Sequence, residues 1–433
     1  MTEPRLPEPR LPEPGSLAEQ VRVLCAEQLT RRRFLIGAGA ASVLAVAACR
    51  PVAAPTPGPK PTPGPPSSVS SRVLVVLEMA GGHDGYSMFI PYKNPTYYQL
   101  RPTVSVPAAQ VIPIAGQSSG LHPNLVKLQH RNLAFVDGVG PSHPNDSHFD
   151  MIKRWWEADT DGAHQSVSGF FGRLCDAAAD PNAAAAGLCI AWRTTPALVA
   201  NTSTTLSIPP DSDAQYPAPW DPTLANSWMT AQRAMAVAGS GAPPADKSAR
   251  SGITTAIKFA DATVHMPGPS AVYPNTGLGQ QLSLAARLIR TQIGLKVLYL
   301  PWDGPFDSHS DHRGNHDPLM TELDNALDMF LGDMQANGLA NQVVVASMSE
   351  FGRRADQNTN GLDHGTASVM FLAGAANGGV YGQAPNWNAL DSNGNLVSPT
   401  NLADYYATLA QWLGVPASQV LAVPGTPIAG LVP

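Results

Sequence analysis

Short unbroken runs of apolar residues alternate along this chain with longer amphipathic stretches. Runs of this kind, bounded by polar or turn-forming residues, are typical of strands that are buried on both faces, as in parallel sheets. They cover residues 72–77, 132–139, 295–300 and 343–346, and another follows Gly365. Apolar positions at helical spacing cover residues 280–293, about 318–337 and 401–413. The pattern predicts an α/β fold with a central, mostly parallel sheet.

Polar residues of several kinds follow the apolar run that begins at Val343. A carboxylate and a guanidinium come first, Glu350 and Arg353, and then Asp363 and His364 lie between glycines. Function in open α/β sheets gathers where the parallel strands end, so we interpret this stretch as part of a functional site. The alternative is a surface pair of Glu350 with Arg353 and an ordinary loop turn.

Two earlier apolar runs also end in polar residues. The first leads to Gly81 and Gly82, whose backbone N–H groups would form an anion-binding turn, or else only a tight loop. The second leads to Ser147 and His148, at the predicted start of a helix. These two are either a nucleophile or anion-binding pair favoured by the helix dipole, or a plain helix cap with a surface histidine.

The run at residues 295–300 leads to Asp307 and His309. A carboxylate and an imidazole together suit zinc, manganese or iron better than calcium, so we expect a divalent metal ion here. His312 and His316 follow in the sequence. They precede the helix predicted from about Pro318, and we interpret them as solvated loop residues.

Composition narrows the class of protein. The chain has 433 residues, a formal net charge of −6 and 14% charged residues, which argues against a nucleic-acid partner because phosphate binding needs basic patches.

Residues 178–274 are rich in Ala, Ser, Thr and Pro with one clear strand at 188–192, so we expect an insertion or cap over the core. Cys175 and Cys189 form either a disulfide or two buried free thiols.

The first 71 residues predict export. Residues 30–36 resemble a twin-arginine signal, and the apolar stretch 34–48 that overlaps them is too short to span a membrane comfortably. Residues 46–49 resemble a lipobox with Cys49 as the acylated residue; cleavage without a lipid is the alternative. The Pro-rich stretch 50–71 would be a semi-rigid tether. We therefore expect a signal peptide over 1–48, recognised by the twin-arginine export machinery, a tether over 49–71, and an extracytoplasmic, membrane-anchored domain over 72–433.

Seven short motifs in the folded part resemble, in order, those of the domain of unknown function 1501 (DUF1501) family of exported bacterial proteins. They are residues 81–85, 147–150, 169–173, 307–309, 349–354, 361–365 and 378–382. That family resembles the alkaline phosphatase and sulfatase superfamily, in which a mostly parallel sheet lies between helices and divalent metals are held at the strand ends. The resemblance implies a three-layer α/β/α fold.

The same resemblance implies a metal-ligand set. Asp307, His309 and His364 would be ligands, with an acid from Glu350 or Asp363 and another, Glu78 or Asp84, from the end of the first strand. A departure from the superfamily is that the sulfatase motif Cys-x-Pro-x-Arg is missing from the sequence.

The function that the resemblance implies is the metal-dependent hydrolysis of small or polymeric phosphate or sulfate esters. Ser147 is the best-placed candidate nucleophile, and Arg353 with the glycine-turn amides would hold the negative oxygens. The alternative is a non-catalytic surface lipoprotein that binds a sugar or an anionic polymer in the same cleft.

Overall fold

A computed structural model describes residues 71–180, 183–212, 214, 222–237 and 244–433. The predicted signal peptide, Cys49 and nearly all of the predicted tether lie outside these residues. Within the described part, none of the helices has the length and apolarity needed to cross a bilayer.

The described strands include nine that form one central sheet, in the order β11-β5-β10-β9-β1-β8-β6-β7, with β12 paired to β5. The strands β9, β1, β8, β6 and β7 are mutually parallel, whereas β10 runs antiparallel to both of its neighbours. The mostly parallel sheet that was predicted is therefore confirmed. The strands are β1 (Val73–Ala80), β5 (Leu133–Gly140), β6 (Gly187–Ile190), β7 (Thr205–Ile208), β8 (Val297–Asp303), β9 (Val343–Met348), β10 (Ser368–Gly374), β11 (Gly379–Gly382) and β12 (Thr400–Asn401).

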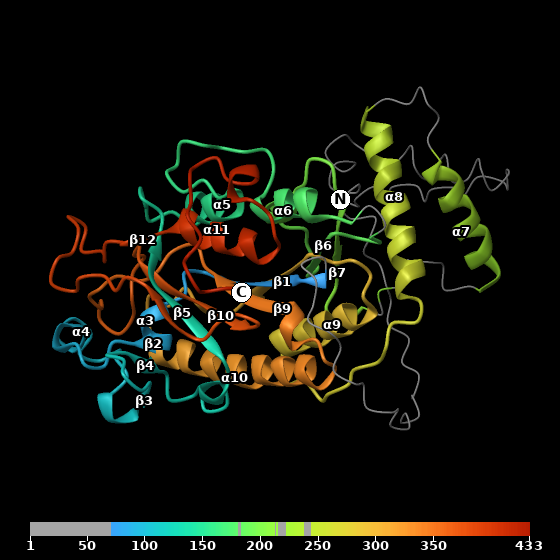
Figure 1. The fold of residues 1–433 in the computed structure, drawn as a ribbon. Helices are drawn as coiled ribbons and strands as arrows, with labels where there is room; N and C mark the ends of the chain where they lie inside the picture. The colour runs from blue at the N-terminus through green and yellow to red at the C-terminus, as the bar shows by residue number, and fades with distance from the viewer. Residues whose placement is uncertain (1–70, 181–182, 213, 215–221, 238–243) are drawn as a thin grey trace, which may run out of the picture.

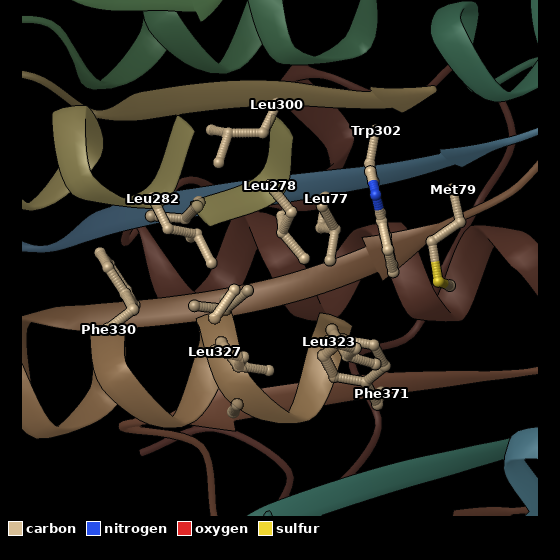
Figure 2. Close-up of a cluster of buried hydrophobic side chains, with 14 of the residues drawn as sticks. Leu77, Met79, Leu278, Leu282, Leu300, Trp302, Leu323, Leu327, Phe330 and Phe371 are labelled. Carbon is tan, nitrogen blue, oxygen red and sulfur yellow. The ribbon is translucent and has the colours of Figure 1, made fainter. Parts of the chain in front are cut away.

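Side chains of β1 alternate between two apolar cores, one on each face of the sheet. Leu77 and Met79 pack with α9 (Gly277–Thr291) and α10 (His312–Ala336), as Figure 2 shows. Leu74 and Val76 pack on the other face with α5 (His148–Glu157), α6 (Phe170–Ala178) and α11 (Leu402–Trp412). Figure 1 shows these two groups of helices above and below the sheet. The three-layer α/β/α fold is confirmed.

The smaller elements gather at the two ends of the sheet. A second sheet, in the order β2-β4-β3, and two short helices lie at one end: β2 (Phe89–Ile90), β3 (Ile112–Pro113), β4 (Gly120–Leu121), α3 (Gly85–Met88) and α4 (Pro95–Leu100). At the other end, α7 (Pro222–Ala236) and α8 (Pro244–Thr263) pack side by side (Figure 1).

Two sequence predictions need correction. The region 178–274 is not wholly an insertion, because β6 and β7 belong to the central sheet and only the segment after Ile208 carries the α7–α8 pair. The prediction missed β7 because its sequence, TLSI, is short and half polar. Cys175 on α6 and Cys189 on β6 are both buried and free, so the disulfide alternative is wrong and the free-thiol alternative holds.

Candidate metal centre

Three parallel strands end side by side and bring a glycine turn and two acidic residues to one edge of the sheet. Gly81 follows β1, Asp307 follows β8 and Glu350 follows β9, and these strands are paired in register. The loop that leads into β10 adds His364. The first residue of α5 adds His148, because the Ser147 hydroxyl caps this helix by accepting from the Asp150 N–H at 3.3 Å. Segments far apart in the sequence thus converge as predicted.

Three imidazoles point the same nitrogen, Nε2, at the carboxylate of Asp307. His309 Nε2 lies 3.1 Å and His364 Nε2 lies 3.2 Å from Asp307 Oδ1. His148 Nε2 lies 3.4 Å from the other oxygen, Oδ2. The Nε2 atoms of His309 and His364 are only 2.9 Å apart. We call His148, Asp307, His309 and His364 the metal-centre residues.

The other nitrogen of each ring, Nδ1, lies within hydrogen-bonding distance of an oxygen acceptor. His148 Nδ1 lies 2.9 Å from Glu350 Oε1, and His309 Nδ1 lies 2.7 Å from Asp363 Oδ1. His364 Nδ1 lies 2.8 Å from the backbone carbonyl of Asp146. An acceptor at Nδ1 places the proton of a neutral ring there and leaves a lone pair on Nε2. This is how proteins orient histidines that bind a metal through Nε2.

Neutral rings in this tautomer bring several lone pairs together. His309 Nε2 and His364 Nε2 would both present lone pairs to each other and to Asp307, which is unfavourable without a positive charge between them. A divalent cation removes this conflict. Three imidazole nitrogens and a carboxylate match the donor preferences of zinc, manganese and iron. The residues therefore fit the predicted metal ion.

The charges around the centre shift several pKa values. The hydrogen bond with Glu350 raises the pKa of His148 above its ordinary value, against the opposing effect of partial burial. Burial alone would raise the pKa of Asp307, but the hydrogen bond and charge of Arg353 hold it below the usual range. The hydrogen bond from His309 lowers the pKa of Asp363. Both aspartates are therefore ionised at neutral pH.

Glu350 occupies the position where the glycine turn was expected to hold a substrate anion. The Gly81 N–H donates to Glu350 Oε1 at 2.8 Å, and the Glu350 side chain is buried. Gly82 has a positive φ of 84°, and a Cβ atom there would lie 2.2 Å from the ring of Phe351. The turn thus allows close packing and binds a carboxylate of the protein itself, which corrects the anion-binding prediction.

Arg353 is fully buried and its guanidinium is occupied by the protein. It donates to the backbone carbonyls of Gly82 at 2.6 Å, Leu362 at 2.9 Å and Phe306 at 3.1 Å, and also to that of Gly81. It donates in addition to Asp307 Oδ1 at 2.8 Å. These contacts join three loops of the centre. The prediction that Arg353 holds substrate oxygens is therefore wrong, because its donors already have partners.

The two acids at the end of the first strand also lie outside the centre. Asp84 is buried and forms an ion pair with Arg101 at 2.7 Å. Glu78 is buried beside α5, where Trp156 Nε1 donates to it at 2.9 Å. Neither carboxylate contacts the metal-centre residues in the part of the chain that the structure describes, which corrects the suggestion that one of them is a ligand.

Ser147, the predicted nucleophile, is instead a plain helix cap, which was the alternative interpretation. Its hydroxyl caps α5, and no hydrogen bond joins it to a histidine of the described chain.

Two other groups of histidine and aspartate are explained without a metal. His122, His316 and Asp317 have potential ligand atoms within 4.8 Å of one another. However, the Asn124 N–H donates to His122 Nδ1 at 3.2 Å, so His122 carries its proton on Nε2 and donates it to Asp317.

The second group lies in the loop after α5 and consists of Asp159, Asp161 and His164. Its carboxylates accept from the backbone N–H groups of His164 and Ala163, as turns of this kind require.

The structure also corrects the interpretation of His312 and His316. Helix α10 begins at His312, six residues before the predicted start, and both rings are buried. Sequence reasoning also gave no role to Ser308, which lies between two predicted ligands. The sequence did contain a signal for Ser308: successive side chains of an extended segment point in opposite directions, so a residue between two outward-facing ligands points inward.

Comparison with known proteins places this chain in a family. None of the curated proteins matches its sequence. Among solved structures, it is similar to the lipoteichoic acid synthase LtaP from Listeria monocytogenes, with 10% identity over 81% of this chain and 74% of that chain and a TM-score of 0.34. It is also similar to a sulfatase from Pseudoalteromonas sp., with 10% identity over 82% and 70% of the two chains and a TM-score of 0.37.

A third similar structure is a phosphonate monoester hydrolase from Silicibacter pomeroyi, with 9% identity over 84% and 78% of the two chains and a TM-score of 0.37. At these identities and scores, the similarities concern the fold and carry no argument about activity. The family model described as "Protein of unknown function (DUF1501)" matches residues 157–428, more than half of the chain. The chain therefore belongs to the DUF1501 family.

Proposed function

We propose that this protein is a metal-dependent hydrolase of phosphate or sulfate esters that is exported and anchored outside the cytoplasm. One observation carries the proposal. His148, His309 and His364 each have Nδ1 at an oxygen acceptor and Nε2 directed at Asp307. An oxygen acceptor at Nδ1 of each ring is the arrangement by which proteins orient histidines that bind a metal through Nε2.

The bound divalent cation would supply Lewis-acid polarisation of an ester oxygen. Nε2 of the three histidines and the carboxylate of Asp307 would hold it, while Glu350, Asp363 and the Asp146 carbonyl keep the rings in the required tautomer. Four protein ligands would fill a tetrahedral zinc shell, but they leave positions open on a manganese or iron ion that takes five or six ligands. Hydrolysis needs such an open position, so manganese and iron are favoured.

The centre is accessible to a substrate. The side chains of Asp307 and His309 are 45% and 46% exposed. The edge of the sheet that carries them is opposite to the edge where β1 begins, and an eight-residue strand such as β1 spans about 26 Å. The proposed substrate is a small-molecule or polymeric anionic ester.

The experiment that tests the proposal measures metal content and turnover together. The purified chain is analysed for manganese, iron and zinc and assayed with aryl phosphate and aryl sulfate esters. We expect about one bound ion per chain and measurable turnover of one ester class. His364→Ala removes one nitrogen ligand and should abolish both, whereas the control His130→Ala, at an exposed histidine outside the centre, should change neither.

The outcomes separate this proposal from its competitor. A chain without metal, or turnover that survives in His364→Ala, contradicts the hydrolase. Bound metal without turnover favours the second candidate, a lipoprotein that binds a sugar or anionic polymer. The observation that favours this candidate is that Arg353 is fully buried with all three guanidinium nitrogens bonded to the protein, and that Ser147 serves as a helix cap.

A further inference from the structure

A layer of buried polar side chains lies directly beneath the metal-centre residues. It consists of Asp84, Ser87, Arg101, Ser308 and His312, none of which is more than 2% exposed. Ser308 connects this layer to the centre because it lies between Asp307 and His309 in the sequence. Its two neighbours point to the solvent side of the loop, whereas Ser308 points inward, with its Oγ 2.7 Å from His312 Nδ1.

The contacts in this layer assign the proton on each group. Arg101 NH1 donates to Asp84 Oδ2 at 2.7 Å, and this carboxylate also accepts the hydroxyl proton of Ser87. The Ser87 oxygen lies 2.9 Å from His312 Nε2 and has no second proton to give, so it accepts from the Nε2–H. Burial lowers the pKa of His312 to about 4, against the opposing charge of Asp84, so the ring carries one proton. Nδ1 is therefore a bare acceptor for Ser308 O–H.

The segment from Ser308 to His312 connects the two loops that carry the metal ligands. The His312 N–H donates to the carbonyl of Asn360, and the Leu362 N–H donates to that of Ser308, both at 3.0 Å. A Cβ atom on Gly361 would lie 2.1 Å from the backbone of His309, so only glycine permits this approach. The hydrogen bonds of His312 and Ser308 thus connect the loop of Asp307 and His309 with the loop of His364.

We propose that His312 is a positioning residue for the metal centre: by accepting the hydroxyl proton of Ser308, it holds Asp307 and His309 on the same side of their loop. This proposal rests on the proposed function, because it concerns the affinity of that centre for its ion. Loss of the contact leaves Ser308 with only backbone hydrogen bonds, from its own N–H to Phe306 and from the Leu362 N–H to its carbonyl, so the two ligands are held toward the cation less firmly. Groups that orient metal ligands change metal affinity by about 10- to 100-fold; since Ser308 acts through the backbone, we expect about tenfold.

The experiment measures Mn²⁺ affinity of the full-length chain by calorimetric titration. Ser308→Ala removes the donor. His312→Gln keeps an amide near the place of Nε2 but loses the acceptor at Nδ1, and His312→Asn keeps an acceptor near the place of Nδ1. We expect about tenfold weaker binding for Ser308→Ala and His312→Gln, no further loss in the double variant, and less than threefold loss for His312→Asn. Ser347→Ala, which removes a buried hydroxyl in β9, is the control and should bind as the wild type does.

Each outcome decides one point. If the wild type binds neither Mn²⁺ nor, in the same titration, Fe²⁺ or Zn²⁺, both the proposed function and this inference fail. If the wild type binds and Ser308→Ala binds equally well, or if the two losses add, only the inference fails. A cooperative unfolding transition in the presence of a chelator shows that a variant is folded without metal. If His312→Gln does not fold, Ser308→Ala, which removes only one oxygen atom, tests the inference alone.

Discussion

Replacing Arg353 by lysine separates a residue that holds the loops together from one that binds a substrate anion. The guanidinium has five acceptors in the structure, four backbone carbonyls and the carboxylate of Asp307. Lysine keeps the positive charge but has only three donors on a single nitrogen. At least two of the five acceptors therefore lose their partner in Arg353→Lys.

The size of the effect follows from burial. A buried acceptor left without a partner costs about 1–3 kcal/mol, so two of them give about 2–6 kcal/mol. Asp307 is 45% exposed and water can replace its lost partner, whereas Gly82, Phe306 and Leu362 are buried. We therefore expect the free energy of unfolding to fall by about 3 kcal/mol, since lysine can satisfy some carbonyls but not all of them.

Urea unfolding of the wild type and of Arg353→Lys, both in the presence of a chelator, measures this difference in the metal-free protein. The neighbouring variant Arg354→Lys is the control, because Arg354 is only partly buried and its loss of stability should stay below about 1 kcal/mol. A structural role of Arg353 is contradicted if Arg353→Lys unfolds within about 1 kcal/mol of the wild type while KM for an ester rises. That result would mean that Arg353 binds substrate.

Two further predictions concern protons and thiols. Metal binding requires a neutral His148, and the hydrogen bond with Glu350 raises the pKa of this ring above 6.5. The affinity for Mn²⁺ should therefore fall as the pH drops through that raised pKa. Binding of Mn²⁺ in this pH range should also release a proton. Calorimetric titrations across this range, in buffers that differ in ionisation enthalpy, measure the proton release; affinity that does not change with pH contradicts the role of His148. Burial raises the pKa of Cys189 to about 12 and that of Cys175 further. With Cys25 and Cys49 replaced by serine, a thiol reagent should label neither cysteine until the chain unfolds, and rapid labelling of either in native protein would disprove their burial.

The sheet and the edge that carries the centre could be predicted from the sequence because they depend on local pattern. Unbroken apolar runs identified β1, β5, β8 and β9, and the ends of parallel strands meet at one edge. Asp307 and His309 on one segment and His364 on another, which the family resemblance grouped as ligands, do lie together in the structure. His148 was also expected at a helix start, because Ser147 has the character of a helix cap.

The individual roles depended on contacts that a sequence does not contain. Arg353 was interpreted as an anion-binding group, but its partners are carbonyls up to 272 residues away. Asp84 was interpreted as a ligand, but Arg101 neutralises it within the core. His312 was placed in a loop because Pro318 suggested a helix start, whereas this proline lies inside α10. Glu350 and Asp363 were proposed as ligands, and their observed contacts are with the Nδ1 atoms of His148 and His309.

The position of a bound metal ion tests the metal centre most directly. Crystals of the protein grown with Mn²⁺ and measured near the manganese absorption edge would locate the ion by its anomalous signal. We predict one strong peak within coordination distance of Nε2 of His148, His309 and His364 and of a carboxylate oxygen of Asp307. No peak at these atoms, or a peak only at other residues of the chain, would contradict the metal centre and the hydrolase derived from it.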